Sequence, residues 1–233
     1  MLIDGALPES AERIAANIQS LGFRVADVKI ILNSHVHFDH AGGISKLQQL
    51  SGARVLASKW SAAVMKTGGV GRGDPQYGEV RGITPIKNVH KLKNGETFRL
   101  GTIAVTAHLT PGHTPGSTSW SWRSCEGDLC HDLVYADSLT PVSAAGFRFS
   151  EHPAVLADFE MSFAFLEALP CDILITPHPE VAELWDHLEM RQRGVMPDPM
   201  INSRACRQLA EQGRERLRQR LVEERAKRGN PSE

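Results

Sequence analysis

The sequence is poor in the features that mark membrane proteins and nucleic-acid binders. It has no apolar run near the roughly 20 residues that span a bilayer, so no membrane helix is predicted. It also has no excess of positive charge, because 26 Lys and Arg residues face 27 Asp and Glu residues. Hydrophobic residues at 41% and charged residues at 23% are average for a globular chain and exclude a disordered or fibrous one. We therefore expect one domain over residues 1–233 with no membrane or nucleic-acid partner. We also expect a monomer, an expectation that does not follow from the composition.

The start of the chain is not expected to be a secretion signal. Residues 1–5 contain no basic segment, apolar stretch or small-residue cleavage site. Residues 2–5 instead read as the tail of a strand that enters a turn. Two explanations are open: a compact chain that starts with one strand, or the loss of an N-terminal piece.

Cysteine is scarce, with four residues in the chain. Cys125 and Cys130 flank a polar turn and could close a small hairpin loop, while Cys171 and Cys206 could tie a C-terminal helix to the core. The even number favours two disulfides and an oxidising compartment. The alternative is four free thiols in a cytosolic protein, and spacing leaves all three pairings open.

Hydrophobic periodicity predicts alternating helices and strands with several hairpins, and hence an α/β fold with a mixed sheet. The predicted strands span 28–34, 53–58, 97–100, 102–109, 118–123, 132–136 and 172–176. The predicted helices span 10–21, 41–50, 60–65, 154–169 and 203–228. Residues 93–96 (KNGE) read as a hairpin turn, and four glycines within 68–73 indicate a flexible loop.

The strongest chemical signal is the segment SHVHFDH at 34–40, which follows an apolar strand. It holds four potential metal ligands within six residues: His35, His37, Asp39 and His40. Imidazole and carboxylate are good ligands for zinc and similar divalent ions. Four ligands this close cannot all serve one tetrahedral ion comfortably, so the spacing predicts two metal ions that draw ligands from this loop.

Two more histidines lie in rigid turns after strands: His113 in TPGHTPG and His178 in TPHP. Ligands in α/β proteins gather at the carboxyl ends of strands, so both are candidate ligands. The remaining histidines read as ordinary surface or capping residues. They are His90, His108, His131, His152 and His187.

The order HxHxDH, PGHTPG and a later strand-end histidine resembles the metallo-β-lactamase superfamily. The segments DGALP (4–8), YADSL (135–139) and LPCD (169–172) resemble the third subclass of class B metallo-β-lactamases. The resemblance implies an αββα sandwich, here without the N-terminal strands of the family, and two Zn²⁺ per chain. Iron or manganese occupies related sites in some members of the superfamily.

The resemblance also implies roles for individual residues. His35, His37 and His113 would hold the first zinc, and Asp39, His40 and His178 the second. Ser138 and Thr140 match positions that contact the substrate carboxylate, and the 68–73 loop and the segment near Phe147 would border the groove. The family pairing joins Cys171 to Cys206, and a Cys125–Cys130 bridge resembles an extra one in some members.

The function implied by the resemblance is hydrolysis of the β-lactam amide bond in penicillins, cephalosporins and carbapenems. A metal-bound hydroxide would attack the carbonyl, and Asp39 would orient it and accept its proton. The enzyme would confer antibiotic resistance from the periplasm. One alternative is a thioesterase or lactonase of the glyoxalase II kind, for which Asp137 lies close to the position of an additional bridging carboxylate. Another is a non-catalytic relative or metal-binding scaffold.

Overall fold

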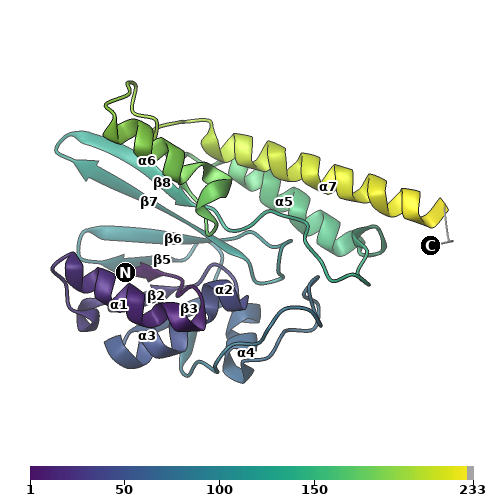
Figure 1. Ribbon diagram of the computed structural model, residues 1–233, viewed down its shortest axis with the longest axis horizontal. Helices are drawn as coiled ribbons and strands as arrows, with labels where there is room; N and C mark the ends of the chain where they lie inside the picture. Colours follow the sequence, from purple (N-terminus) through teal and green to yellow (C-terminus); the bar gives the residue numbers. More distant parts are fainter. Residues whose placement is uncertain (230–233) are drawn as a thin grey trace.

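The computed structural model describes residues 1–229, which form two β-sheets packed face to face with helices on both outer sides (Figure 1). The first sheet is parallel throughout, in the order β1 (Leu2–Ile3), β2 (Ile30–Leu32), β3 (Arg54–Ser58) and β4 (Val89–Leu92). The second has the order β5 (Thr97–Leu100), β6 (Ile103–Leu109), β7 (Thr118–Glu126), β8 (Leu129–Tyr135) and β9 (Ile173–Ile175). It is antiparallel except where β9 joins β8 in parallel.

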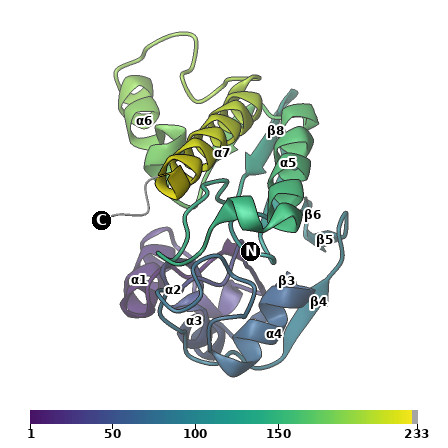
Figure 2. The same ribbon diagram turned by 90° about the vertical axis from the view of Figure 1, so that its right-hand side faces the viewer.

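The helices divide between the two outer faces, as the turned view makes plain (Figure 2). The first sheet carries α1 (Ala11–Ser20), α3 (Ile44–Ser51) and α4 (Lys59–Thr67), with the single-turn α2 (Phe38–Ala41) at its edge. The second sheet carries α5 (Pro153–Ala168) and α7 (Ala205–Gly229), with α6 (Leu184–Gln192) between β9 and α7 in the chain. Short 3-10 turns lie at η1 (Pro8–Ser10), η2 (Val25–Asp27), η3 (Phe149–Glu151) and η4 (Pro179–Ala182).

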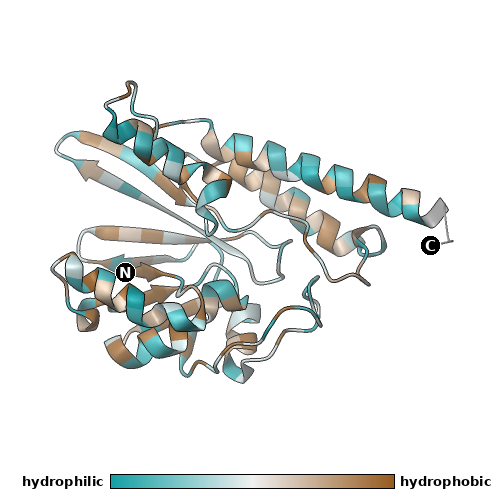
Figure 3. Cartoon of the chain, in the orientation of Figure 1, coloured by the Kyte–Doolittle hydropathy of each residue, from teal (hydrophilic) through white to brown (hydrophobic). Residues whose placement is uncertain are grey.

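Three apolar layers hold this sandwich together. Successive side chains of a strand point to opposite faces, so Ile31 of β2 packs under α1 and α3 while Ile30 and Leu32 pack against the second sheet. A strand buried on both faces reads as a continuous apolar run, which is why β2 is recognisable in the sequence. The third layer lies between the second sheet and α5 with α7, around Phe159 and Phe163. Figure 3 shows apolar residues along the strands and hydrophilic stretches on α7.

Close approach of α7 to α5 depends on a glycine. A Cβ at Gly213 would lie 2.7 Å from the ring of Phe163 and 3.3 Å from Leu139, so a side chain there would force the helix outward. Further along, Glu224 of α7 accepts hydrogen bonds from the backbone N–H groups of Phe149 and Ser150. The helix is therefore fastened to the chain segment that leaves the second sheet.

Two disulfides are present, Cys125–Cys130 at the tip of the β7–β8 hairpin and Cys171–Cys206 between the start of β9 and α7. The Cys125–Cys130 bridge crosses a pair of residues that already face each other in the β7–β8 ladder. Among the described residues, no helix combines the length and the apolar character that crossing a membrane requires.

The fold class predicted from the periodicity is confirmed, but one turn was misread. Residues 93–96 do not form a hairpin turn, because β4 and β5 on either side belong to different sheets. The segment carries the chain from one sheet to the other. It is held against β6, where the Gly95 N–H donates to the carbonyl of Ala107 and the Leu109 N–H donates to Oδ1 of Asn94. A local turn signal does not reveal which sheet the next strand joins. The strand β4 and the helix α6 were not predicted.

Candidate metal centre

The segment SHVHFDH (34–40), called here the metal-binding segment, begins where β2 ends. Asp4 holds its first residue in place. The carboxylate of Asp4 accepts hydrogen bonds from the Ser34 N–H at 2.8 Å, the Ser34 hydroxyl at 2.6 Å and the Asn33 side-chain amide at 3.0 Å. Asp4 itself has a left-handed backbone, with φ of 59°. The turn after β1 thereby points this carboxylate at the turn after β2. Sequence reasoning missed Asp4 as a site residue and read it only as part of a turn.

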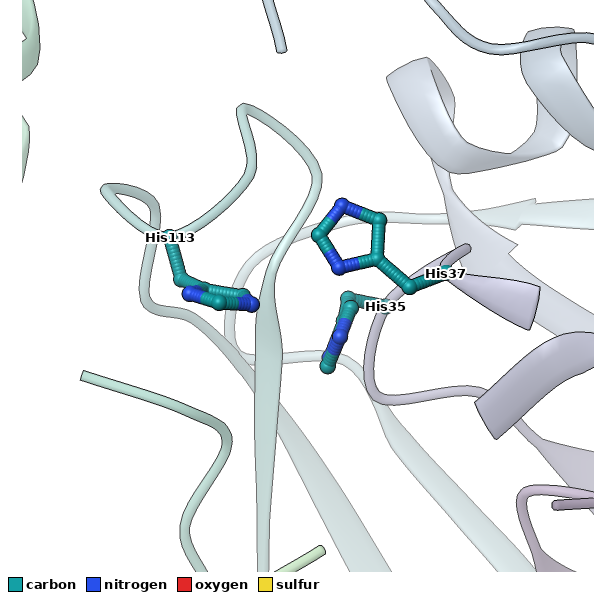
Figure 4. Close-up of side chains that lie close together, drawn as sticks. All are labelled: His35, His37 and His113. Atoms are coloured by element: carbon teal, nitrogen blue, oxygen red, sulfur yellow. The ribbon is translucent and has the colours of Figure 1, made fainter. Parts of the chain in front are cut away.

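His35, His37 and His113 form the first cluster, with one potential ligand atom from each within 4.8 Å of the others. Figure 4 shows the three rings gathered in one place, two from the loop after β2 and one from the turn after β6. The nearest pair of ring centroids, those of His35 and His37, is 4.7 Å apart in an edge-to-face arrangement. All three side chains are buried.

Each ring of the first cluster gives one nitrogen to an outer partner. Nδ1 of His35 lies 2.8 Å from Asp137, Nε2 of His37 lies 2.9 Å from Asp74, and Nδ1 of His113 donates to the Thr140 carbonyl at 2.9 Å. Such partners fix the tautomer of a histidine and direct its other nitrogen towards a metal. The nitrogens left for an ion are Nε2 of His35, Nδ1 of His37 and Nε2 of His113. Nε2 of His35 is buried with no hydrogen-bond partner, as expected of a ligand atom.

Asp39, His40 and His178 form the second cluster under the same 4.8 Å limit. Asp39 Oδ2 lies 3.2 Å from Nε2 of His40 and 3.7 Å from Nε2 of His178. Nε2 of His40 is nevertheless buried without a hydrogen bond of acceptable geometry. Oδ2 of Asp39 and Nε2 of His40 are therefore close together without bonding to each other, as expected of two atoms that bind the same ion. Asp39 and His40 lie in the one-turn helix α2, although the sequence suggested a loop there.

Electrostatics favour the metal-binding forms of His35, His113 and Asp39. For His40, burial would lower the pKa, but the adjacent carboxylates of Asp39 and Asp4 outweigh it and raise that pKa. Burial, together with neighbouring imidazoles, lowers the pKa of His35 well below its ordinary value and lowers that of His113 to about 4. Neutral imidazole is the form that binds metal. Burial would raise the pKa of Asp39, but the adjacent His40 outweighs it and lowers that pKa, so Asp39 is a carboxylate at neutral pH. The donor types and the unpartnered Nε2 atoms of His35 and His40 fit two divalent ions.

Asp137 lies outside both clusters. It is buried just after β8. Its Oδ1 lies 2.8 Å from Nδ1 of His35, whereas Nε2 of the same ring is the nitrogen left for an ion. Its backbone N–H donates to the Ser119 hydroxyl at 3.0 Å. Its position is therefore that of an outer partner of a ligand. Asp74 plays the corresponding part for His37, and nothing in the glycine-rich segment around it distinguished it in the sequence.

The segment after Asp137 borders the second cluster. A cavity is lined by Asp137, Ser138, Leu139, Thr140, Thr176, Pro177, His178, Val181, Leu209, Gly213 and Arg216. Ser138 and Thr140 thus lie beside His178, and the Thr140 carbonyl holds His113.

Two loops flank this region and are joined to each other. The Ala144 N–H donates to the Pro75 carbonyl at 2.9 Å, and the Ala145 N–H donates to Glu79 at 2.6 Å. The loop predicted at 68–73 therefore continues into residues 75–79. These residues contact residues 144–145, which follow Thr140 in the chain. Phe147, predicted to border the groove, stacks on His152 with ring centroids 4.1 Å apart. None of the five histidines predicted to be ordinary lies in either cluster.

An αββα sandwich with two histidine-rich clusters at the carboxyl ends of its strands defines a dinuclear metallohydrolase class. A family model described as the metallo-beta-lactamase superfamily matches residues 1–185, and the chain belongs to that superfamily.

Several solved metallo-beta-lactamase structures are similar to this chain in both sequence and fold. MEM-A1, a subclass B3 metallo-beta-lactamase from a soil metagenome library, is 50% identical at a TM-score of 0.92, covering 97% of this chain and 86% of its own. The Rm3 metallo-beta-lactamase is 49% identical at a TM-score of 0.92, covering 96% and 84%. SMB-1 is 44% identical at a TM-score of 0.92, covering 95% and 85%. This chain is therefore similar to subclass B3 enzymes over nearly its whole length.

The curated relatives of this chain include hydroxyacylglutathione hydrolases and a protein of uncharacterised function. A hydroxyacylglutathione hydrolase of Anaeromyxobacter dehalogenans is 30% identical over 157 residues, which are 67% of this chain and 48% of that protein. YobT of Bacillus subtilis, whose function is uncharacterised, is 33% identical over 124 residues, 51% of this chain and 50% of that protein. The chain thus spans about half the length of these curated relatives.

Proposed function

We propose that this protein hydrolyses the amide bond of β-lactams, with penicillins, cephalosporins and carbapenems as the substrate class. The observation that carries the proposal is the pair of three-ligand clusters, with Asp137 outside both and its Oδ1 on Nδ1 of His35. The likeness to subclass B3 structures supports it over nearly the whole chain.

Two zinc ions are the proposed cofactors, one held by His35, His37 and His113 and one by Asp39, His40 and His178. Histidine nitrogens with a single carboxylate are a typical zinc donor set. When bound, the ions would supply Lewis acidity and an acidified water at neutral pH.

The chain's own residues would supply proton transfer and substrate binding. Asp39 is a carboxylate that lies beside Nε2 of His40 and Nε2 of His178. It can therefore orient a water molecule and hold its proton. Ser138 and Thr140 border the cavity beside His178 and are the proposed contacts of the substrate carboxylate. Asp74 and Asp137 would keep the rings of His37 and His35 oriented.

The proposed setting is the periplasm, where β-lactam hydrolysis confers antibiotic resistance. The two disulfides support an oxidising compartment, because such bridges are rare in the cytosol. A single-domain monomer remains our expectation for residues 1–233.

The competing function is thioester hydrolysis of the glyoxalase II kind, suggested by the hydroxyacylglutathione hydrolases among the relatives. By the family resemblance, that chemistry uses an additional bridging carboxylate close to the position of Asp137. The position of Asp137 outside both ligand clusters speaks against it.

Turnover of nitrocefin and meropenem, compared with S-lactoylglutathione, tests the proposal. We expect hydrolysis of both lactams, loss of activity with a chelator, and about two zinc ions per chain by elemental analysis. Cleavage of the thioester alone would replace the proposed function with the competing one. Full lactam turnover after complete metal removal would contradict the role of the two clusters.

A further inference from the structure

The cavity beside the second cluster has one cationic side chain from a distant part of the chain. Arg216 of α7 lines it together with Ser138, Thr140 and His178. Arg216 therefore borders the same space as the residues proposed above to contact substrate, although Thr140 and Arg216 are 76 positions apart in the sequence.

Its neighbours on the helix are held by carboxylates and Arg216 is not. Arg214 pairs with Glu160 and Glu167, Arg218 with Glu215, and Arg220 with Glu224. Within residues 1–229, Arg216 has no ion pair and no side-chain hydrogen bond. An arginine without a carboxylate partner retains five N–H donors in a planar fork that suits a carboxylate.

The helix geometry directs this residue to the cavity. Leu209, Gly213 and Arg216 are spaced by four and three positions, so they share one face of α7, and all three line the cavity. Gly213 brings that face within contact distance of Leu139, which lies between Ser138 and Thr140. The backbone of α7 is thus fixed close to the proposed substrate-binding segment.

No acidic residue of the cavity neutralises Arg216. Asp137 is the one carboxylate among the lining residues, and it is 1% exposed and hydrogen-bonded to His35. Arg216 is exposed, so an incoming anion can reach it. The cavity therefore presents hydroxyl donors and one uncompensated positive charge.

We propose that Arg216 is a specificity-determining residue that binds the carboxylate of the substrate. The inference rests on the proposed function, since the common bicyclic β-lactams carry a carboxylate next to the lactam nitrogen. Arg216 would form a charge-assisted hydrogen bond with that group while Ser138 and Thr140 contact it from the opposite segment. The guanidinium selects acidic substrates and takes no part in breaking the amide bond.

The test compares a β-lactam acid with its methyl ester, using nitrocefin and the ester of nitrocefin as probes. In R216Q we expect KM for the acid to rise about fivefold, the size of effect that a partly exposed ion pair supports, with kcat nearly unchanged. The ester should be hydrolysed equally by both proteins. R216K should restore part of the preference, because a lysine keeps the charge but not the fork.

Arg207 provides a matched control on the same helix. It is exposed, has no ion pair among the described residues, and lies outside the cavity, so R207Q should leave both substrates unchanged. If the wild-type protein hydrolyses nitrocefin and R216Q keeps the same preference for the acid over the ester, the inference about Arg216 is overturned while the proposed function stands. Equal losses for acid and ester would also overturn the inference. If the wild-type protein hydrolyses no lactam, the proposed function fails and the inference fails with it.

Discussion

The Tyr135 hydroxyl donates a hydrogen bond to Oδ2 of Asp4 across 2.9 Å, although 131 positions separate the two residues. Asp4 follows the edge strand of the first sheet, and Tyr135 ends β8 of the second. The same carboxylate holds Ser34 and Asn33 at the entrance to the metal-binding segment. The two sheets are thus joined at the base of the first cluster by one buried acid.

Removing that hydroxyl tests how much this junction stabilises the fold. Y135F leaves Asp4 buried with one donor fewer, so we expect a loss of about 2 kcal/mol in the free energy of unfolding. Urea denaturation gives the value. Y77F is the control, because Tyr77 is 48% exposed and its hydroxyl has no bond among the described residues. Equal stability of Y135F and wild type would show that the bond to Asp4 contributes nothing net.

Loss of a first-cluster histidine should abolish metal-dependent activity. His113 contributes the nitrogen that comes from the second sheet, so H113A leaves two ligands where three converge. We expect nitrocefin turnover to fall more than about 100-fold and the bound metal to drop by about one equivalent. H187A should change either quantity less than roughly twofold, because His187 lies on α6 outside both clusters. A fully active H113A protein would remove His113 from the proposed site.

Asp74 should tune the metal affinity of the first cluster without touching the ion. D74N keeps an oxygen that can accept from Nε2 of His37 but removes the charge, whereas D74A removes both. We expect affinity to fall about 10-fold for D74N and towards 100-fold for D74A, measured by competition with a coloured chelator. D128N, an exposed carboxylate in the β7–β8 turn, is the control. Identical affinities in all four proteins would contradict the orienting role.

The pH dependence of stability should report on Glu224. Burial would raise its pKa, but the N–H groups of Ser150 and Phe149 and the Arg220 side chain outweigh this and lower it below 4.5. A lowered folded-state pKa gives stability that is fully present above the unfolded pKa and is lost as pH falls through the folded one. We expect E224Q to be less stable than wild type by about 1 kcal/mol at pH 7.

That difference should shrink as the pH falls below 4.5. Urea denaturation at pH 7, 5 and 3.5 measures it, with E223Q as the control because Glu223 is an exposed neighbour on α7. A difference that stays constant over this range would show that the charge of Glu224 is not the stabilising feature.

A site residue could be predicted from the sequence when its signal was local, that is, when the neighbouring residues in the chain marked it. His35, His37, Asp39 and His40 fall within six residues after a recognisable buried strand, so they could be identified from spacing alone. His113 and His178 were found because Pro and Gly mark rigid turns at the ends of strands. The hairpin predicted at 93–96 was wrong because a turn motif carries no information about which sheet the following strand enters.

The sequence by itself determined the fold class and the six candidate ligands, because apolar periodicity and clustered donor residues are local properties of the chain. Only the tertiary structure decided which outer partner holds each ring. Asp74, Asp137 and the Thr140 carbonyl lie between 27 and 102 positions from the histidines they bind. It likewise brought Arg216 to the cavity beside His178. Such pairings depend on how the two sheets and α7 pack against one another, and no local pattern encodes that packing.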